Sequence, residues 1–273
     1  MLSFFRFKPL IDPNSAEWII TTFAWALKHF DRRDFFEHSQ LVQPNNDFFP
    51  GRVSSVEEKA DNIFAHTLRY AGLQHWPFEL KPLIARMTEE ACQRPPLVQT
   101  ELASIVRHSG LEAGEQVAVL VTDTPLYVFY NPQQTLKPED MAASYAQVIG
   151  QHLMVQCQQL PPGGADYFAE AAEIVAHMLG FGVLLSNSAY TFRGGCGSCY
   201  NAMANRQPAL NELESVFTLA LYCRLKQIDQ KVALRYLKKH LHASFKRAAK
   251  QIEQVLQQPD GAGAELIKIT GNF

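Results

Sequence analysis

The spacing of hydrophobic and polar positions predicts two amphipathic helices between residues 138 and 182. On the first, the residues of the buried face recur at Met141, Tyr145, Val148, Ile149, His152 and Leu153. On the second, the same spacing is found at Tyr167, Phe168, Ala171, Ile174, Val175, Met178 and Leu179. We expect the first helix to begin at Pro138, because a proline in the first turn loses no hydrogen bond. The Pro-Pro-Gly-Gly turn at residues 161–164 should end it, and Gly180 and Gly182 let the second helix bend or end.

Similar patterning predicts helices on either side of this pair. One is expected within a unit of residues 14–36, with Asn14 or Ser15 as its cap and with apolar positions from Trp18 to Phe30. Another is expected to begin near Ser55 and to end at Gly72, and two more lie between residues 210 and 257.

Strands are predicted in the middle of the chain. Residues 117–121 and 126–130 are β-branched and aromatic runs on either side of a Thr-Asp-Thr-Pro turn, which is typical of a hairpin. Residues 78–80 also favour a strand. The expected fold class is therefore α+β, predominantly helical with a small antiparallel sheet.

Length and composition favour one large domain spanning residues 1–273, since 47% of the residues are hydrophobic. Within it, residues 1–135 should hold the N-terminal helices and the small sheet. Residues 136–257 should form a helical part, and residues 258–273 a loose tail.

Charge and cysteine content limit the kinds of function that we expect of the protein. A formal net charge of −2 gives no electrostatic case for nucleic acid. No apolar run reaches the roughly 18–20 residues of a membrane span, so no membrane span is expected, and the first residues do not predict a signal peptide. Five cysteines, an odd number, argue against a disulfide framework. A cytoplasmic protein is the expectation.

The helix pair, with its surroundings, resembles a widespread family of uncharacterised bacterial zincin-like proteins, the putative metallopeptidases of the gluzincin HExxH type. The likeness is carried by the Pro138-Glu139 start, by the Asp-Phe-Phe-Pro loop at residues 47–50 and by the Gly180–Gly182 element. It covers most of residues 16–252 and is weakest at residues 80–116. The resemblance implies a zincin-like fold, with the active-site helices in residues 136–257.

The chain departs from the family's pattern at the residues that carry the chemistry. By the register of the resemblance, the two histidine slots hold Gln147 and Gln151, and the slot of the catalytic glutamate holds Val148. The third-ligand slot holds Ala169, and the supporting aspartate slot holds Glu173. A glutamine amide is a poor substitute for imidazole at zinc, and valine cannot take a proton from water. The resemblance therefore implies a degenerate member with no metal and no cofactor.

Two other groups of residues could carry chemistry. Glu170, Glu173 and His177 share one helical face, as metal ligands or an acid–base pair would, although a solvated face with a Glu-to-His pair is the favoured interpretation. Cys196 and Cys199 form a CxxC in a glycine-rich loop, which could be a redox pair, half of a metal site or neither.

The hypothesis that follows is a non-catalytic protein, a pseudo-metallopeptidase with a binding or regulatory role. The ligand would be a protein, a peptide or a small polar molecule held in the former cleft, with Gln147, Gln151, Glu170, Glu173 and His177 as binding residues. The alternative is an enzyme with relocated chemistry. It would be a metal-dependent hydrolase using the Glu170, Glu173 and His177 face or a thiol redox protein using Cys196 and Cys199. His152, one position past a histidine slot, is expected to be a core residue.

Overall fold

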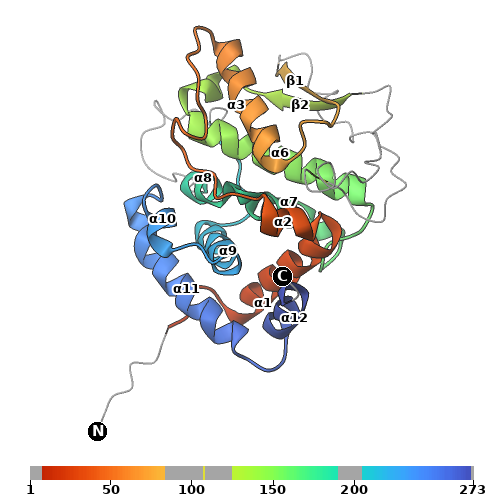
Figure 1. Ribbon diagram of the computed structural model, residues 1–273, viewed down its shortest axis with the longest axis vertical. Helices are drawn as coiled ribbons and strands as arrows, with labels where there is room; N and C mark the ends of the chain where they lie inside the picture. The colour runs from red at the N-terminus through yellow and green to blue at the C-terminus, as the bar shows by residue number, and fades with distance from the viewer. Residues whose placement is uncertain (1–7, 84–106, 108–124, 190–204, 272–273) are drawn as a thin grey trace.

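The computed structural model of the chain describes residues 8–83, 107, 125–189 and 205–271, and these are mostly helical (Figure 1). The α-helices are α1 (Pro13–His29), α2 (Arg32–Glu37), α3 (Val56–Ala71), α6 (Pro138–Cys157), α7 (Phe168–Ala176), α8 (Gly182–Ser188), α9 (Glu212–Leu225), α10 (Gln230–Leu234), α11 (His242–Leu256) and α12 (Ala262–Thr270). Short helical turns are η1 (Pro132–Leu136), η2 (Ala165–Tyr167), the π-helical η3 (His177–Phe181) and η5 (Lys239–Leu241).

The predicted helix pair is confirmed as α6 and α7, which cross at the centre of the molecule (Figure 1). Their backbones approach each other at Gly150, where an added Cβ would lie 2.3 Å from the carbonyl oxygen of Ala172. Only glycine allows this approach. The close crossing sets the position of every α6 side chain relative to α7.

The predicted bend at Gly180 is also confirmed. Gly180 has φ +103° inside η3, which joins α7 to α8 at an angle. An added Cβ here would lie 2.0 Å from the carbonyl oxygen of Gln40, and the Gly180 carbonyl accepts a hydrogen bond from the Val42 amide at 2.9 Å. The bend therefore depends on glycine both for its backbone angle and for the space it leaves.

The helical stretch from Ala165 to Ser188 has the length and mean hydropathy, 1.6, of a membrane span, which the sequence pattern had not suggested. Within this window, 83% of the residues are buried inside the protein. Its apolar side chains thus form the core around which α6 and α9 pack.

The small sheet is parallel, so the antiparallel prediction is wrong. Strand β1 (Phe78–Pro82) pairs with β2 (Leu126–Tyr130), with Phe78 opposite Leu126 and Pro82 opposite Tyr130. The pattern predicted a hairpin because residues 117–121 precede a turn, but that run lies outside the described residues. The described partner of β2 is instead a strand from well before it in the chain. A parallel pair needs a long crossover connection, which residues 83–125 supply.

The helix predicted within residues 14–36 is found as α1, and the end of that unit forms a second helix, α2. Asp31 lies between them with φ +58°, outside the helical region, and its carboxylate caps the Asp34 amide at 3.0 Å. The observed cap of α1 is Asp12, two residues before Asn14 and three before Ser15. The helix α3 begins where predicted, and Ser55 is its cap.

The prediction of a loose tail over residues 258–273 is wrong for residues 262–270, which form α12. This helix packs against α1 (Figure 1), and Leu266 is fully buried there. Lys28 of α1 also forms a 2.7 Å ion pair with Glu265. The composition of the tail is weakly helical, but α1 offers it an apolar surface, so tertiary packing decides its structure.

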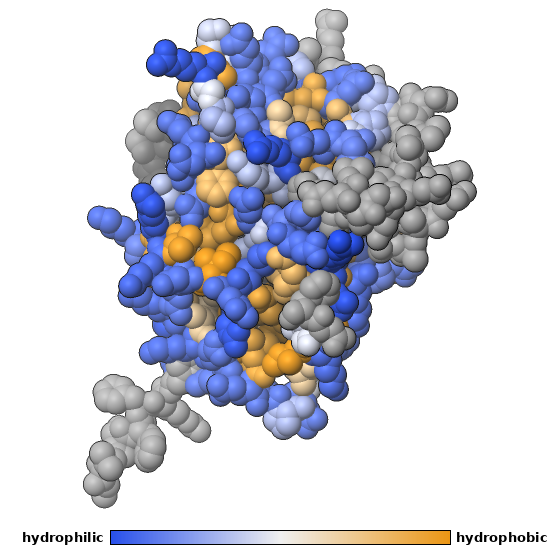
Figure 2. Space-filling view, viewed as in Figure 1, coloured by the Kyte–Doolittle hydropathy of each residue, from blue (hydrophilic) through white to orange (hydrophobic). Residues whose placement is uncertain are grey.

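The surface is mostly hydrophilic, with hydrophobic residues reaching it in small groups on the face shown in Figure 2. Among the described residues, the most exposed large apolar side chains are those of Leu136 and Leu160, at 83% and 66%. They belong to different parts of the chain, and single exposed apolar residues are usual on protein surfaces. We assign no interface to them.

Candidate functional site

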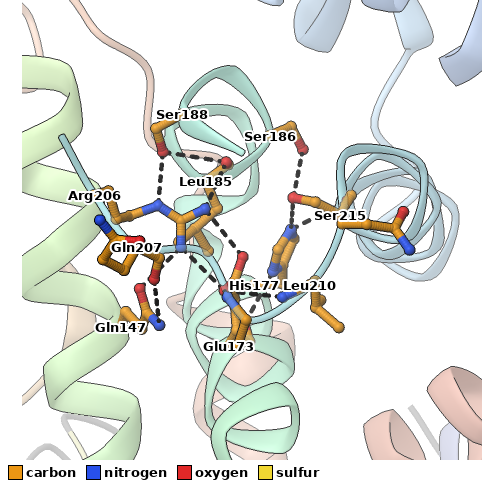
Figure 3. A network of polar contacts seen from close by, with 12 residues as sticks. Gln147, Glu173, His177, Leu185, Ser186, Ser188, Arg206, Gln207, Leu210 and Ser215 are labelled. Carbon is orange, nitrogen blue, oxygen red and sulfur yellow. Dashed lines mark hydrogen bonds and ion pairs between the residues drawn. The ribbon is translucent and has the colours of Figure 1, made fainter. Parts of the chain in front are cut away.

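Arg206 lies at the centre of a buried polar network that connects three helices (Figure 3). Its guanidinium is 2% exposed and forms an ion pair with Glu173 of α7, with Nη1 at 3.0 Å from Oε2 and Nη2 at 3.1 Å from Oε1. Arg206 also donates to Oε1 of Gln147 on α6 at 2.9 Å. Further donations reach Ser188 Oγ at 2.9 Å and the Leu185 carbonyl oxygen at 3.1 Å, both on α8.

The carboxylate of Glu173 is fully buried, and its hydrogen-bonding capacity is used inside the protein. Besides Arg206, it accepts from the backbone amides of Ala209 at 2.7 Å and Leu210 at 3.3 Å. Charge-assisted bonds of this kind offset the cost of burying a carboxylate. Glu173 therefore holds residues 206–210 against α7 and has no room for a substrate.

The slots named by the resemblance have different environments. Gln147 is engaged at both ends of its amide, because Nε2 also donates to the Gln207 carbonyl oxygen at 3.2 Å. Val148 packs against the core, Gln151 is partly exposed, and Ala169 is exposed. The structure thus brings Gln147 and Glu173 together through Arg206.

These residues do not fit a zinc ion. Two neutral amides and an alanine occupy the ligand slots, whereas zinc takes imidazole, thiolate or carboxylate ligands. The one carboxylate at the centre, that of Glu173, is paired with a guanidinium, whose positive charge would repel a metal cation. These residues are therefore assigned no role in metal-dependent catalysis.

Of the predicted Glu170, Glu173 and His177 face, Glu170 is partly exposed and the other two residues are buried. His177 is fully buried, with Nδ1 2.9 Å from the Glu173 carbonyl oxygen and Nε2 3.1 Å from Ser215 Oγ. Burial lowers the pKa of His177 to about 4, because the charged ring is poorly solvated there. The face is thus not solvated at these two residues, and within the described part of the chain no group of three ligating side chains suits a metal.

His152 is confirmed as a core residue. It is 4% exposed, its Nε2 lies 3.2 Å from the Tyr127 carbonyl oxygen, and its ring meets Phe78 edge-on. Burial lowers its pKa to about 4. It ties α6 to both strands of the sheet.

Cys196 and Cys199 lie outside the described residues, so their redox or metal-binding role stays a prediction. Two other cysteines are described and free, Cys157 and Cys223. Burial raises the pKa of both thiols, to about 12 for Cys223, so neither is a reactive thiolate at neutral pH.

A cavity of about 1030 Å³ lies at the start of α6, and not beside the two glutamines of the predicted cleft. Its walls are the loop of residues 44–53, one face of α3, the first turn of α6 and the end of α8. The lining described for it includes neither Gln147 nor Gln151. The cavity therefore lies at the Pro138 end of the helix and adjoins the Arg206 network at Ser188.

Sequence reasoning missed both Arg206 and the charged residues of this cavity. Arg206 follows a glycine-rich loop with no motif around it, and its partner Glu173 lies 33 residues earlier. Asp140 and Lys59 belong to no motif in the sequence. Single charges of this kind give no signal until the fold brings them together.

Comparison of the chain with protein-family models, with curated proteins and with solved structures finds no match, so the zincin-like resemblance stays a prediction.

Proposed function

We propose that this chain is a non-catalytic binding protein of zincin-like ancestry, with the cavity at the start of α6 as its ligand site. The observation that carries the proposal is the internal use of the central polar groups. One arginine binds Gln147 and Glu173, while a separate cavity beside them remains open. General acid–base catalysis needs a titratable group within reach of a substrate. Neither Glu173 nor the buried His177 is accessible in this way.

The size of the cavity supports binding of a small molecule. Ligand pockets usually enclose about 300–1,000 Å³ and combine an apolar lining with a few polar groups. This cavity, at about 1030 Å³, has apolar walls at Phe49, Ile63 and Leu184 and polar groups from several asparagines and lysines. Arg206, in contrast, bonds to both Gln147 and Glu173 and lies between them.

The proposal is tested by screening small-molecule fragments against isotopically labelled protein by NMR. We expect binders that shift the signals of the cavity walls. In the variant Val53→Trp these binders should lose at least tenfold in affinity, because an indole would fill space that the ligand needs. Val53 is 39% exposed, so the change should cost little stability.

The matched control is Val56→Trp, at a 50% exposed position outside the described lining. It should leave binding unchanged. If no fragment shifts the cavity signals, or if both variants bind equally well, the cavity is not the ligand site and the proposal fails.

A further inference from the structure

The charges that line the cavity indicate the chemistry of its ligand. Three lysines, Lys59, Lys137 and Lys238, and two carboxylates, Glu139 and Asp140, come from different walls. Each of these groups either has a hydrogen-bond partner in the protein or has none among the described residues.

Three of the five are bonded inside the protein. Lys238 Nζ donates to the Asn187 carbonyl oxygen at 2.6 Å, and Lys137 Nζ donates to Oδ1 of Asn205. The Glu139 carboxylate accepts from the Asn187 side-chain amide. Each of these groups thus has a hydrogen-bond partner in the protein. The two lysines bond to neutral oxygens, so they keep their charge and contribute to the electrostatic field in the cavity.

The remaining two are Asp140 and Lys59. Within the residues that the structure describes, neither side chain has a hydrogen bond or an ion pair, although both are only partly exposed. Burial raises the pKa of Asp140, which shows that its carboxylate is poorly hydrated, while the nearby lysines act in the opposite direction. A partly desolvated carboxylate without a partner favours an ammonium or another strong donor.

The two free groups belong to different elements, Asp140 to the first turn of α6 and Lys59 to α3. The apolar wall of the cavity is formed by Phe49, Val53, Ile63 and Leu184. A ligand that satisfies all three features has a positive group, a negative group and an apolar body.

A simple anion such as phosphate fits less well, even though α6 begins at this cavity. Helix N-termini attract anions, and the three lysines would add to that attraction. However, Glu139 and Asp140 occupy the first turn and would repel an anion, and Lys137 and Lys238 are already bonded.

We propose that the cavity binds a zwitterion with an apolar body, of the kind that a short apolar peptide with free ends presents. Its ammonium pairs with Asp140, its carboxylate pairs with Lys59, and its side chains pack on the apolar wall. The inference rests on the proposed binding function and names the ligand class of that same site.

The test uses trileucine in three forms, titrated calorimetrically into the unmodified protein: with free ends, N-acetylated and C-amidated. Each modification removes one charge of the ligand, so each should weaken binding by roughly tenfold or more, the value of one charge-assisted hydrogen bond. A parallel titration with free leucine shows whether a single amino acid or a peptide binds more tightly.

Protein variants assign the two ends. Asp140→Asn should lower the affinity for trileucine with free ends by roughly tenfold. It should not lower the affinity for the N-acetylated form further, because both changes remove the same contact. Lys59→Gln should behave in the same way toward the C-amidated form. Lys250→Gln is the matched control, and it should change affinity less than threefold, roughly, since Lys250 is exposed on α11 and lies outside the described lining of the cavity.

Equal affinity for the three forms of trileucine would overturn the inference. If neutral fragments bind at the cavity but trileucine does not, the ligand class is wrong while the binding function holds. If neither binds, both proposals fail. The ligand modifications are made on unmodified protein, so the result does not depend on how well any variant folds.

Discussion

Replacing Arg206 with methionine is expected to lower the free energy of unfolding by about 3–5 kcal/mol, the usual cost of removing one partner from a buried ion pair. The change leaves the fully buried Glu173 carboxylate without its counter-charge and leaves Gln147 and Ser188 without a donor. Urea unfolding followed by circular dichroism measures the loss.

Two comparisons make this result specific. Glu173→Gln combined with Arg206→Met should be less destabilised than the sum of the two single variants, because no buried charge is left unpaired. Arg224→Met removes an arginine from a pair in which both side chains are about half exposed, and it should cost at most about 1 kcal/mol. If Arg206→Met costs no more than Arg224→Met, the network does not hold the core together.

Replacing Gly180 with alanine is expected to destabilise the protein by about 2–6 kcal/mol, the sum of two costs. An L-residue at φ +103° is strained, which costs about 1–3 kcal/mol. The new Cβ would also lie 2.0 Å from the Gln40 carbonyl oxygen, so the loop before α3 or the η3 turn must move, and overpacking adds about 1–3 kcal/mol. Urea unfolding again gives the difference.

Gly164→Ala serves as the control for the backbone part alone. Gly164 also has a positive φ, +86°, but nothing lies within 4 Å of its added Cβ. It should therefore show only the cost of the strained angle. Equal losses at Gly180 and Gly164 would mean that the contact with Gln40 has no weight in holding the bend.

The sequence predicted the parts of the fold that depend on local patterns. The α6 and α7 helices, the start of α3 near Ser55 and the bend at Gly180 are found where the sequence patterns and glycine predict them. The direction of β1 relative to β2 could not be predicted in this way, because strand pairing across residues 83–125 is not a local property. The helix α12 was missed for the same reason, since it is stabilised by α1.

The candidate site was predictable only in outline. The sequence itself shows that Gln147, Gln151 and Ala169 are poor zinc ligands and that Val148 cannot act as a base. The arginine at the centre of the polar network could not be predicted, because only the fold brings Arg206 to Glu173. Arg107 offers a second case, since it forms a 3.0 Å buried ion pair with Asp34 that no pattern indicates. Long-range pairs of buried charges are specified by packing.

The central claim is that the Arg206 network has a structural role and holds no metal. A zinc-edge anomalous difference map from crystals grown with excess zinc tests it most directly. The proposal predicts no anomalous peak within bonding distance of Gln147, Gln151 or Glu173, with Arg206 remaining on the Glu173 carboxylate. A zinc peak at about 2.0–2.2 Å from any of these side chains, with Arg206 displaced, would contradict it.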